Sequence, residues 1–177
     1  MVSVSQLITV AQLKYPSYSV FFAGPANSVN NIFNKTNLPF ITAVYSYSAK
    51  TGTWSFCVVK AGSCSGTLTA MVDGAGYWVY ATSSTIVLSF GGWVVQPGYP
   101  PPSYSLYKGW NLVGYKPEPT VGSETVSNYL SSLGNNYDPT HVYLYSSGTW
   151  SLLTPTDLLY PGEAIWVYVT SPATLTP

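Results

Sequence analysis

Residues 74–83 read Gly-Ala-Gly-Tyr-Trp-Val-Tyr-Ala-Thr-Ser, and residues 162–171 read Gly-Glu-Ala-Ile-Trp-Val-Tyr-Val-Thr-Ser. The chain therefore contains two versions of one segment, rich in the aromatic and β-branched residues typical of strands. Three further blocks repeat upstream in the same order, which indicates a duplicated structural module. They are 28–33 with 125–130, Val-Tyr-Ser-Tyr (44–47) with Val-Tyr-Leu-Tyr (142–145), and Gly-Thr-Trp-Ser at both 52–55 and 148–151.

The patterning of both copies predicts a mainly β fold of two tandem modules, each a small sandwich or barrel-like unit with one short helix. A Pro-rich spacer, 96–103, is expected to separate module one (1–95) from module two (104–177). In module two the helix is expected at 123–133, capped by Ser123 and ended by Gly134. The strands of module two are predicted at 104–115, 141–145, 149–153 and 165–170. Module one is predicted to have strands at 18–22, 41–48, 53–59, 67–72, 77–82 and 85–90, and a helix at 28–33.

An N-terminal arm, residues 1–13, precedes the repeated blocks. It alternates polar and apolar residues as a strand does, and it has no counterpart in module two unless 97–103 takes that role. The arm is expected to be either an edge strand of its own module or a strand given to a neighbouring molecule. Its apolar residues are Val2, Val4, Leu7, Ile8 and Val10.

Charged residues make up only 7% of the chain, with six basic and six acidic residues and a net charge of zero. Nucleic acid is excluded as a partner, because phosphate binding requires a field of Lys and Arg. A net charge near zero removes the repulsion between copies and favours self-association. No run of about 18 apolar residues is present, so no membrane span is expected.

Cys57 and Cys64 flank a segment that reads as a hairpin tip, and cysteines facing each other across a hairpin can reach disulfide distance. A disulfide is favoured over two reduced thiols or a zinc site, for which His141 is the only other soft ligand. A disulfide indicates an oxidising compartment, outside the cell or on its surface. Asn34 begins an Asn-Lys-Thr glycosylation sequon that agrees with this location.

The aromatic content is high, with 16 Tyr and six Trp, and four of the Trp occupy repeated positions. We expect these four to be core residues of their own modules; a sugar-binding role would instead require them exposed in a row. Trp93 and Trp110 lie outside the repeated blocks and are candidates for the junction between modules. The repeated residues are Trp54, Trp78, Trp150 and Trp166.

Catalytic chemistry finds little support in the sequence. His141 is the only histidine, and no nucleophile motif accompanies it. The six acids are scattered over turns, without the spacing of a calcium loop. The sequence therefore predicts neither an enzyme nor a cofactor.

The second module opens with Lys108-Gly109-Trp110-Asn111-Leu112-Val113-Gly114-Tyr115, continues with Gly148-Thr149-Trp150 and closes with 161–168, Pro-Gly-Glu-Ala-Ile-Trp-Val-Tyr. This order resembles modules found in tandem in secreted archaeal and bacterial surface proteins. The resemblance covers module two and module one without its opening, and it implies a structural role at the cell surface.

The expected function is a structural subunit of an extracellular filament, pilus or surface layer, with copies of the chain as partners. The alternative is a carbohydrate-binding or adhesion module with surface glycans as partners.

Overall fold

The structure is a computed structural model that describes residues 4–9, 28–29, 41–60, 63–82, 103–116, 122–146 and 148–177. Several predictions lie outside these residues: the strands at 18–22 and 85–90, most of the helix at 28–33, most of the spacer, Asn34, Trp93, and Val2 and Val10 of the arm.

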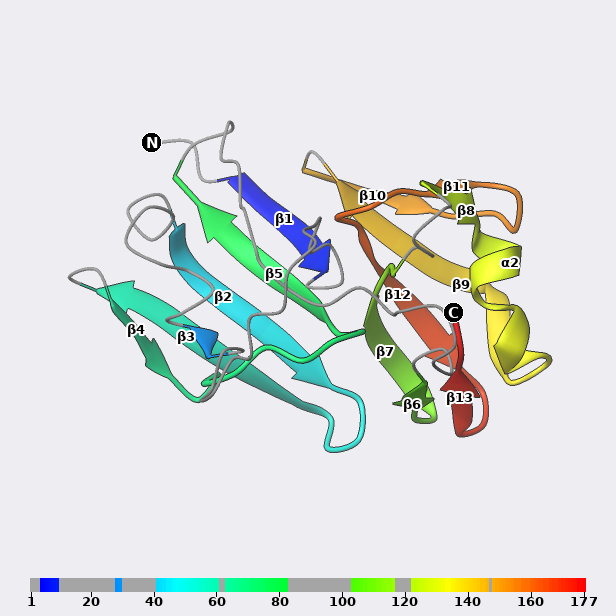
Figure 1. Ribbon diagram of the computed structural model, residues 1–177, viewed down its shortest axis with the longest axis horizontal. Helices are drawn as coiled ribbons and strands as arrows, with labels where there is room; N and C mark the ends of the chain where they lie inside the picture. Colours follow the sequence, from blue (N-terminus) through cyan, green and yellow to red (C-terminus); the bar gives the residue numbers. More distant parts are fainter. Residues whose placement is uncertain are drawn as a thin grey trace, which may run out of the picture.

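The first sheet contains five antiparallel strands from the first half of the chain (Figure 1). Their order across the sheet is β1-β5-β2-β3-β4. The strands are β1 (Val4–Thr9), β2 (Ile41–Ser48), β3 (Thr53–Lys60), β4 (Ser63–Gly66) and β5 (Gly76–Ala81).

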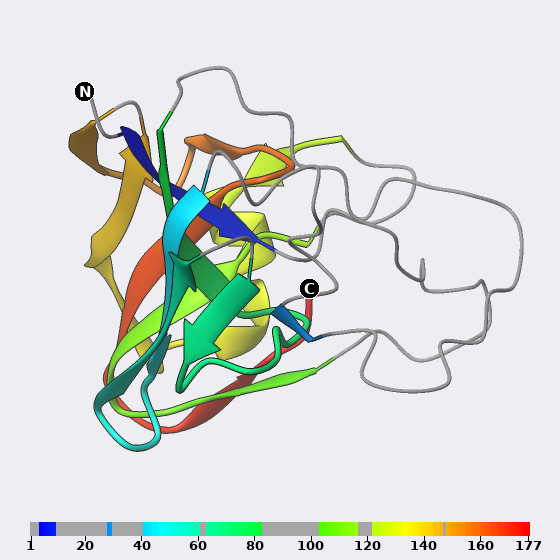
Figure 2. The same ribbon diagram turned by 90° about the vertical axis from the view of Figure 1, so that its left-hand side faces the viewer.

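The second sheet contains four antiparallel strands from the second half, in the order β10-β9-β12-β7. They are β7 (Gly109–Gly114), β9 (Tyr137–Ser146), β10 (Thr149–Leu152) and β12 (Ala164–Val169). Two small ribbons flank this sheet: β6 (Tyr104–Leu106) with β13 (Ala173–Leu175), and β8 (Glu124–Thr125) with β11 (Leu158–Leu159). A short helix, α2 (Val126–Tyr129), and a 3-10 turn, η2 (Ser131–Leu133), cover one face of the sheet, as the edge-on view in Figure 2 shows.

The two sheets share one topology. The order β1-β5-β2-β3 in module one matches β7-β12-β9-β10 in module two. Leu7 of β1 pairs with Trp78, and Leu112 of β7 pairs with the equivalent Trp166, so Gln6-Leu7-Ile8 takes the place of Asn111-Leu112-Val113. The prediction that the arm has no counterpart in module two is therefore wrong.

The mainly β prediction is confirmed, and several strand boundaries agree to within a residue. Two elements differ. Residues 67–72 do not form the expected strand; the strand that follows β3 and pairs with it is β4, which lies earlier and ends at Gly66. Gly66 has a φ of 153°, and a side chain there would collide with the Phe56 carbonyl. The helix expected at 123–133 is divided into α2 and η2, and its cap is Thr125, whose hydroxyl accepts from the Asn128 N–H. Within the described residues neither large sheet closes into a barrel.

Each sheet packs one face against its own core. In module two, α2 and η2 supply Val126, Tyr129 and Leu133, which pack against Ile165 and Val167 of β12. In module one, Val44, Cys57, Tyr77 and Val79 point into a second core. Each core therefore lies on one side of its sheet, and the opposite face of each sheet contacts the other module.

Cys57 in β3 and Cys64 in β4 form the predicted disulfide, with their Cα atoms 5.5 Å apart. Gly66 pairs with Cys57 and Val59 pairs with Cys64, so the bridge runs diagonally between the two strands. It closes a short loop and therefore restricts the unfolded chain only modestly.

Replacing both cysteines with serine is expected to lower the free energy of unfolding by about 2.5 kcal/mol through the loop-entropy term for a loop of eight residues, and by about 1 to 3 kcal/mol more because Cys57 is buried in the core. Urea denaturation of the variant and of the native protein measures the difference. The fold should persist, because the bridge lies at one edge of the sheet; a variant without cooperative unfolding would contradict this.

Candidate interaction surface

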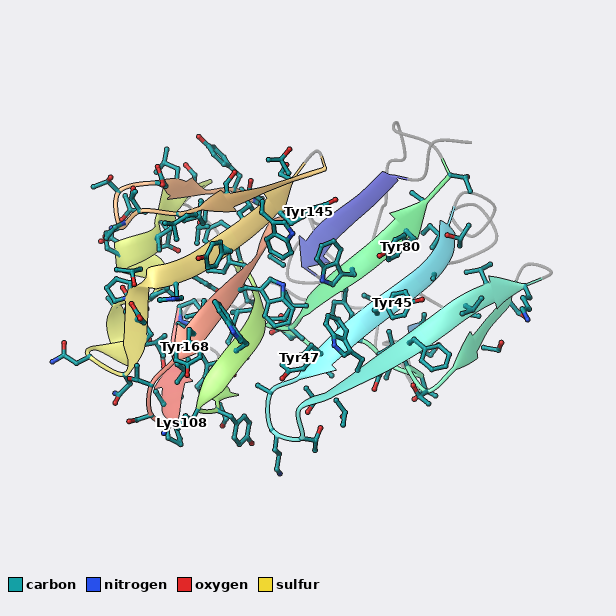
Figure 3. All side chains as sticks on the ribbon, turned by 180° about the vertical axis from the view of Figure 1, so that it is seen from behind. Tyr45, Tyr47, Tyr80, Lys108, Tyr145 and Tyr168 are labelled. Atoms are coloured by element: carbon teal, nitrogen blue, oxygen red, sulfur yellow. A yellow bond between two sulfur atoms is a disulfide. The ribbon has the colours of Figure 1, made fainter. Side chains whose placement is uncertain are left out.

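Alternation along the strands places a row of aromatic side chains on the sheet faces opposite the two cores. Tyr45 and Tyr80 from module one and Tyr145 and Tyr168 from module two point to this same side (Figure 3). We call this surface the aromatic face. Module one contributes Tyr45, Tyr47, Trp54, Phe56, Trp78 and Tyr80, and module two contributes the equivalent Tyr143, Tyr145, Trp150, Leu152, Trp166 and Tyr168, together with Trp110.

The two modules meet on this face through reciprocal contacts of the repeated residues. Tyr47 packs on Trp166 with ring centroids 5.2 Å apart, and the equivalent pair, Tyr145 and Trp78, lies at 4.7 Å. A second pair repeats in the same way: Trp54 lies 5.9 Å from Trp166, and Trp150 lies 5.7 Å from Trp78. The modules are therefore related by a pseudo-two-fold axis, with the same patch used on both sides.

The axis passes close to Gly76 and Ala164, which are equivalent residues and face each other. A Cβ atom built on Gly76 would lie 2.8 Å from the Ala164 Cβ atom and 2.8 Å from the Leu112 Cγ atom. Leu112 and Ala164 are buried in a cluster that also includes Trp78 and Trp166. The absence of a side chain at Gly76 allows the two sheets to approach this closely.

Polar contacts near the ends of β5 and β7 also join the two modules, and these contacts do not follow the pseudo-two-fold axis. The Gly114 N–H donates to the Gly74 carbonyl at 2.9 Å. Asp73 forms an ion pair with Lys116 and accepts a hydrogen bond from the Tyr104 hydroxyl at 3.0 Å. Burial and the nearby Asp73 carboxylate raise the pKa of Tyr104, so this phenol remains a donor at neutral pH.

The prediction that the four repeated Trp form the cores of their own modules is wrong. Trp54 and Trp150 are 48% and 51% exposed, and Trp78 and Trp166 are half-buried at the boundary between modules. The reason is the alternation of β5 and β12: Tyr77 and Val79, or Ile165 and Val167, occupy the core side. Trp110 contacts the rings of Trp166, Tyr143, Tyr168 and His141, all in module two.

A hollow of about 520 Å³ opens on the aromatic face where the modules meet. The Trp166 Nε1 atom is buried and has no hydrogen-bond partner among the described residues. The polar groups of the walls are four indole N–H groups and two phenol hydroxyls. The lining residues are Tyr47, Trp54, Trp110, Tyr143, Trp150 and Trp166.

Twelve of the thirteen side chains that define the aromatic face are aromatic, and the other is Leu152. The His141 ring lies 6.1 Å from Trp110 at the edge of the face. Its Nδ1 atom lies 2.8 Å from Asp138 Oδ2. Hydrogen bonds from Thr140 lower the pKa of Asp138, so this carboxylate is ionised at neutral pH.

The geometry around His141 gives it an exposed carboxylate and a threonine hydroxyl as neighbours. The Thr140 Oγ1 atom lies 3.0 Å from the imidazole and also donates to Asp138. A nucleophile would need to be free to attack a substrate in a cleft, and the hollow is lined by aromatic residues instead. Among the described residues, no group of three or more His, Cys, Asp or Glu side chains is placed to hold a metal ion. Within the same residues no helix is long and apolar enough to cross a membrane.

Comparisons of the chain with protein-family models, with curated proteins and with solved structures found no match. The function of the aromatic face is therefore inferred from its own residues.

One sequence signal indicates the aromatic face. In both copies the aromatic residues recur at alternate positions of neighbouring strands, such as Tyr45 with Tyr47 and Tyr143 with Tyr145.

Proposed function

We propose that the protein is a structural subunit of an extracellular assembly, built from copies of itself. The main support for this proposal is that the central strands of both sheets, which lie side by side in one layer, have apolar side chains on both faces. One face is filled by each module's core, and the other is the aromatic face. Antiparallel sheets that face water on one side are usually polar there, whereas sheets apolar on both faces are covered on both. A large exposed apolar patch is typical of an interaction site.

The charge pattern and the disulfide support the same function. With equal numbers of acids and bases, copies of the chain do not repel one another at neutral pH. The bridge between Cys57 and Cys64 fits an oxidising location outside the cell. The resemblance of the Gly-Trp-Asn-Leu-Val-Gly-Tyr opening to tandem surface-protein modules supports this location as well.

The N-terminal arm pairs with β5 of its own chain over six residues, from Val4↔Ala81 to Thr9↔Gly76. It also lies beside β7, β9 and β12 of module two. In the described structure the arm is thus an edge strand of its own sheet, which was one of the two expected arrangements. If β1 were donated to a neighbour, it would pair with β5 of a second chain in the register that it has here with its own β5. Strand donation is therefore a proposal for how the copies assemble.

A concentration series in the analytical ultracentrifuge, followed by electron microscopy, tests the proposed function. The native protein is expected to form species larger than a monomer and, at high concentration, ordered filaments or sheets. Because the contacts of the aromatic face are mainly apolar, added salt should not dissolve the assemblies. A protein that stays monomeric throughout, without ordered particles, would show that it is not an assembly subunit.

A glycan-binding module is the second candidate, favoured by the half-exposed Trp54 and Trp150 beside the hollow. Aromatic rings can stack on the apolar faces of sugars. Sugar hydroxyls, however, lose their hydrogen bonds to water in the hollow, and its lining replaces them only with indole N–H groups and phenol hydroxyls, without a carboxylate or an amide side chain. This loss makes a protein surface the better-supported occupant.

A further inference from the structure

We propose that the aromatic face pairs with the aromatic face of a second copy of this chain, so that the two layers stack face to face across the hollow. This inference rests on the proposed function and names the surface that pairs two copies; because such a contact closes on itself, filaments or sheets would use a further contact between the pairs. Its occupant is a second copy rather than a glycan or a donated strand.

The size of the face suits such a contact. The seven strands that carry its side chains are spaced about 4.8 Å apart, and each has about six residues with a rise of about 3.3 Å. The resulting face measures roughly 650 Å². A stable protein interface buries about 800 Å² on each partner. Sheets also stack face to face in this way within β-sandwiches.

The absence of charge points to a copy of the same surface. In a symmetric contact each residue meets the same patch of the partner, so any charge near the axis would meet its own kind. The side chains near the axis are aromatic or aliphatic, and the charged residues on this side lie at its margins: Lys60 at the end of β3 and Lys108 just before β7 (Figure 3). A face built for a charged partner would have the complementary charge within it.

The pseudo-two-fold axis also favours pairing of like faces. Equivalent aromatic residues from both modules lie on the same side of the layer, so the axis runs through the layer rather than along it. The face therefore matches itself approximately after half a turn, so two like faces can meet with equivalent residues repeated on both sides of the contact.

The anchors of the contact are the side chains that the face leaves most exposed. Trp54 and Trp150 stand on either side of the hollow, and Phe56 and Leu152 extend the same strands outward at 40% and 54% exposure. Exposed Trp side chains beside a concave surface are typical of the residues that dominate binding energy in protein interfaces. In the stacked arrangement the hollow of each copy receives side chains from the other.

Sedimentation velocity of the full chain tests the proposal with Trp54→Ser and Trp150→Ser, singly and together. Each single change is expected to weaken self-association at least tenfold, and the double variant to sediment as a monomer. Leu158→Ser is the matched control, because Leu158 is 45% exposed but lies in β11, outside the aromatic face. It should associate as the native chain does. Circular dichroism establishes that each variant is folded, and Phe56→Ser with Leu152→Ser provides a second pair should a Trp variant unfold.

The outcomes separate this inference from the proposed function. If the native chain assembles and the double Trp variant assembles equally well, another surface such as β1 or an open sheet edge is used, and face-to-face pairing is wrong while the structural role stands. If the native chain is monomeric at every concentration, both are wrong. If it is monomeric and binds cellohexaose or chitohexaose through Trp54 and Trp150, the face is a glycan surface and the inference is overturned.

Discussion

Replacing Trp166 with alanine is expected to lower the free energy of unfolding by about 3 kcal/mol, and Trp78→Ala by a similar amount. Trp166 contacts Tyr47 and Trp54 of the other module, and its removal would leave a void on the pseudo-two-fold interface. Urea denaturation monitored by circular dichroism measures both changes.

Trp54 and Trp150 contact the same interface but are about half exposed, so truncation of either to alanine should cost less, no more than about 1.5 kcal/mol. If Trp54→Ala proved as costly as Trp166→Ala, the distinction between the half-buried and the exposed aromatic residues would be wrong. The interpretation of the exposed residues as anchors for a partner would then fail as well.

Gly76→Val is expected to destabilise the protein by about 3 kcal/mol, because even the first carbon of the new side chain meets Ala164 and Leu112 at 2.8 Å. Ala164 is attached rigidly to its own strand, so relief of the collision requires the two sheets to separate. Thermal and urea unfolding measure the loss. Gly122→Val is the matched control, since a Cβ atom at Gly122 meets nothing within 4 Å.

A compensating change makes this prediction sharper. Gly76→Ala alone should lower the free energy of unfolding, and combining it with Ala164→Gly should recover part of this loss. The two positions are equivalent, so the double variant moves one methyl group from one side of the axis to the other. Recovery would be incomplete, since Leu112 stays in place. No recovery at all would show that Gly76 and Ala164 do not face each other.

The positions of most strands could be predicted from sequence, because alternation and turn glycines are local signals. The repeated Gly-Thr-Trp-Ser blocks marked the same hairpin in both modules, joining β2 to β3 and β9 to β10. The disulfide followed from cysteines on either side of a short turn. These features depend on neighbouring residues alone.

The interface between the modules could not be predicted in this way. Tyr77, Trp78 and Val79 are three apolar residues in succession, so alternation does not say which side of β5 faces the core. The place of β1 depends on the match of Gln6-Leu7-Ile8 to Asn111-Leu112-Val113, which is too short to recognise before the strands are paired. Both features are set by contacts between distant parts of the chain.

A pair of double-mutant cycles tests most directly the central claim that repeated aromatic residues join two modules across a pseudo-two-fold axis. One cycle combines Tyr47→Ala with Trp166→Ala, and the other combines the equivalent Tyr145→Ala with Trp78→Ala. Unfolding free energies should give a favourable coupling of about 0.5 to 1.5 kcal/mol in each cycle, similar in the two. Additive effects in both cycles, with no coupling between the modules, would contradict the claim.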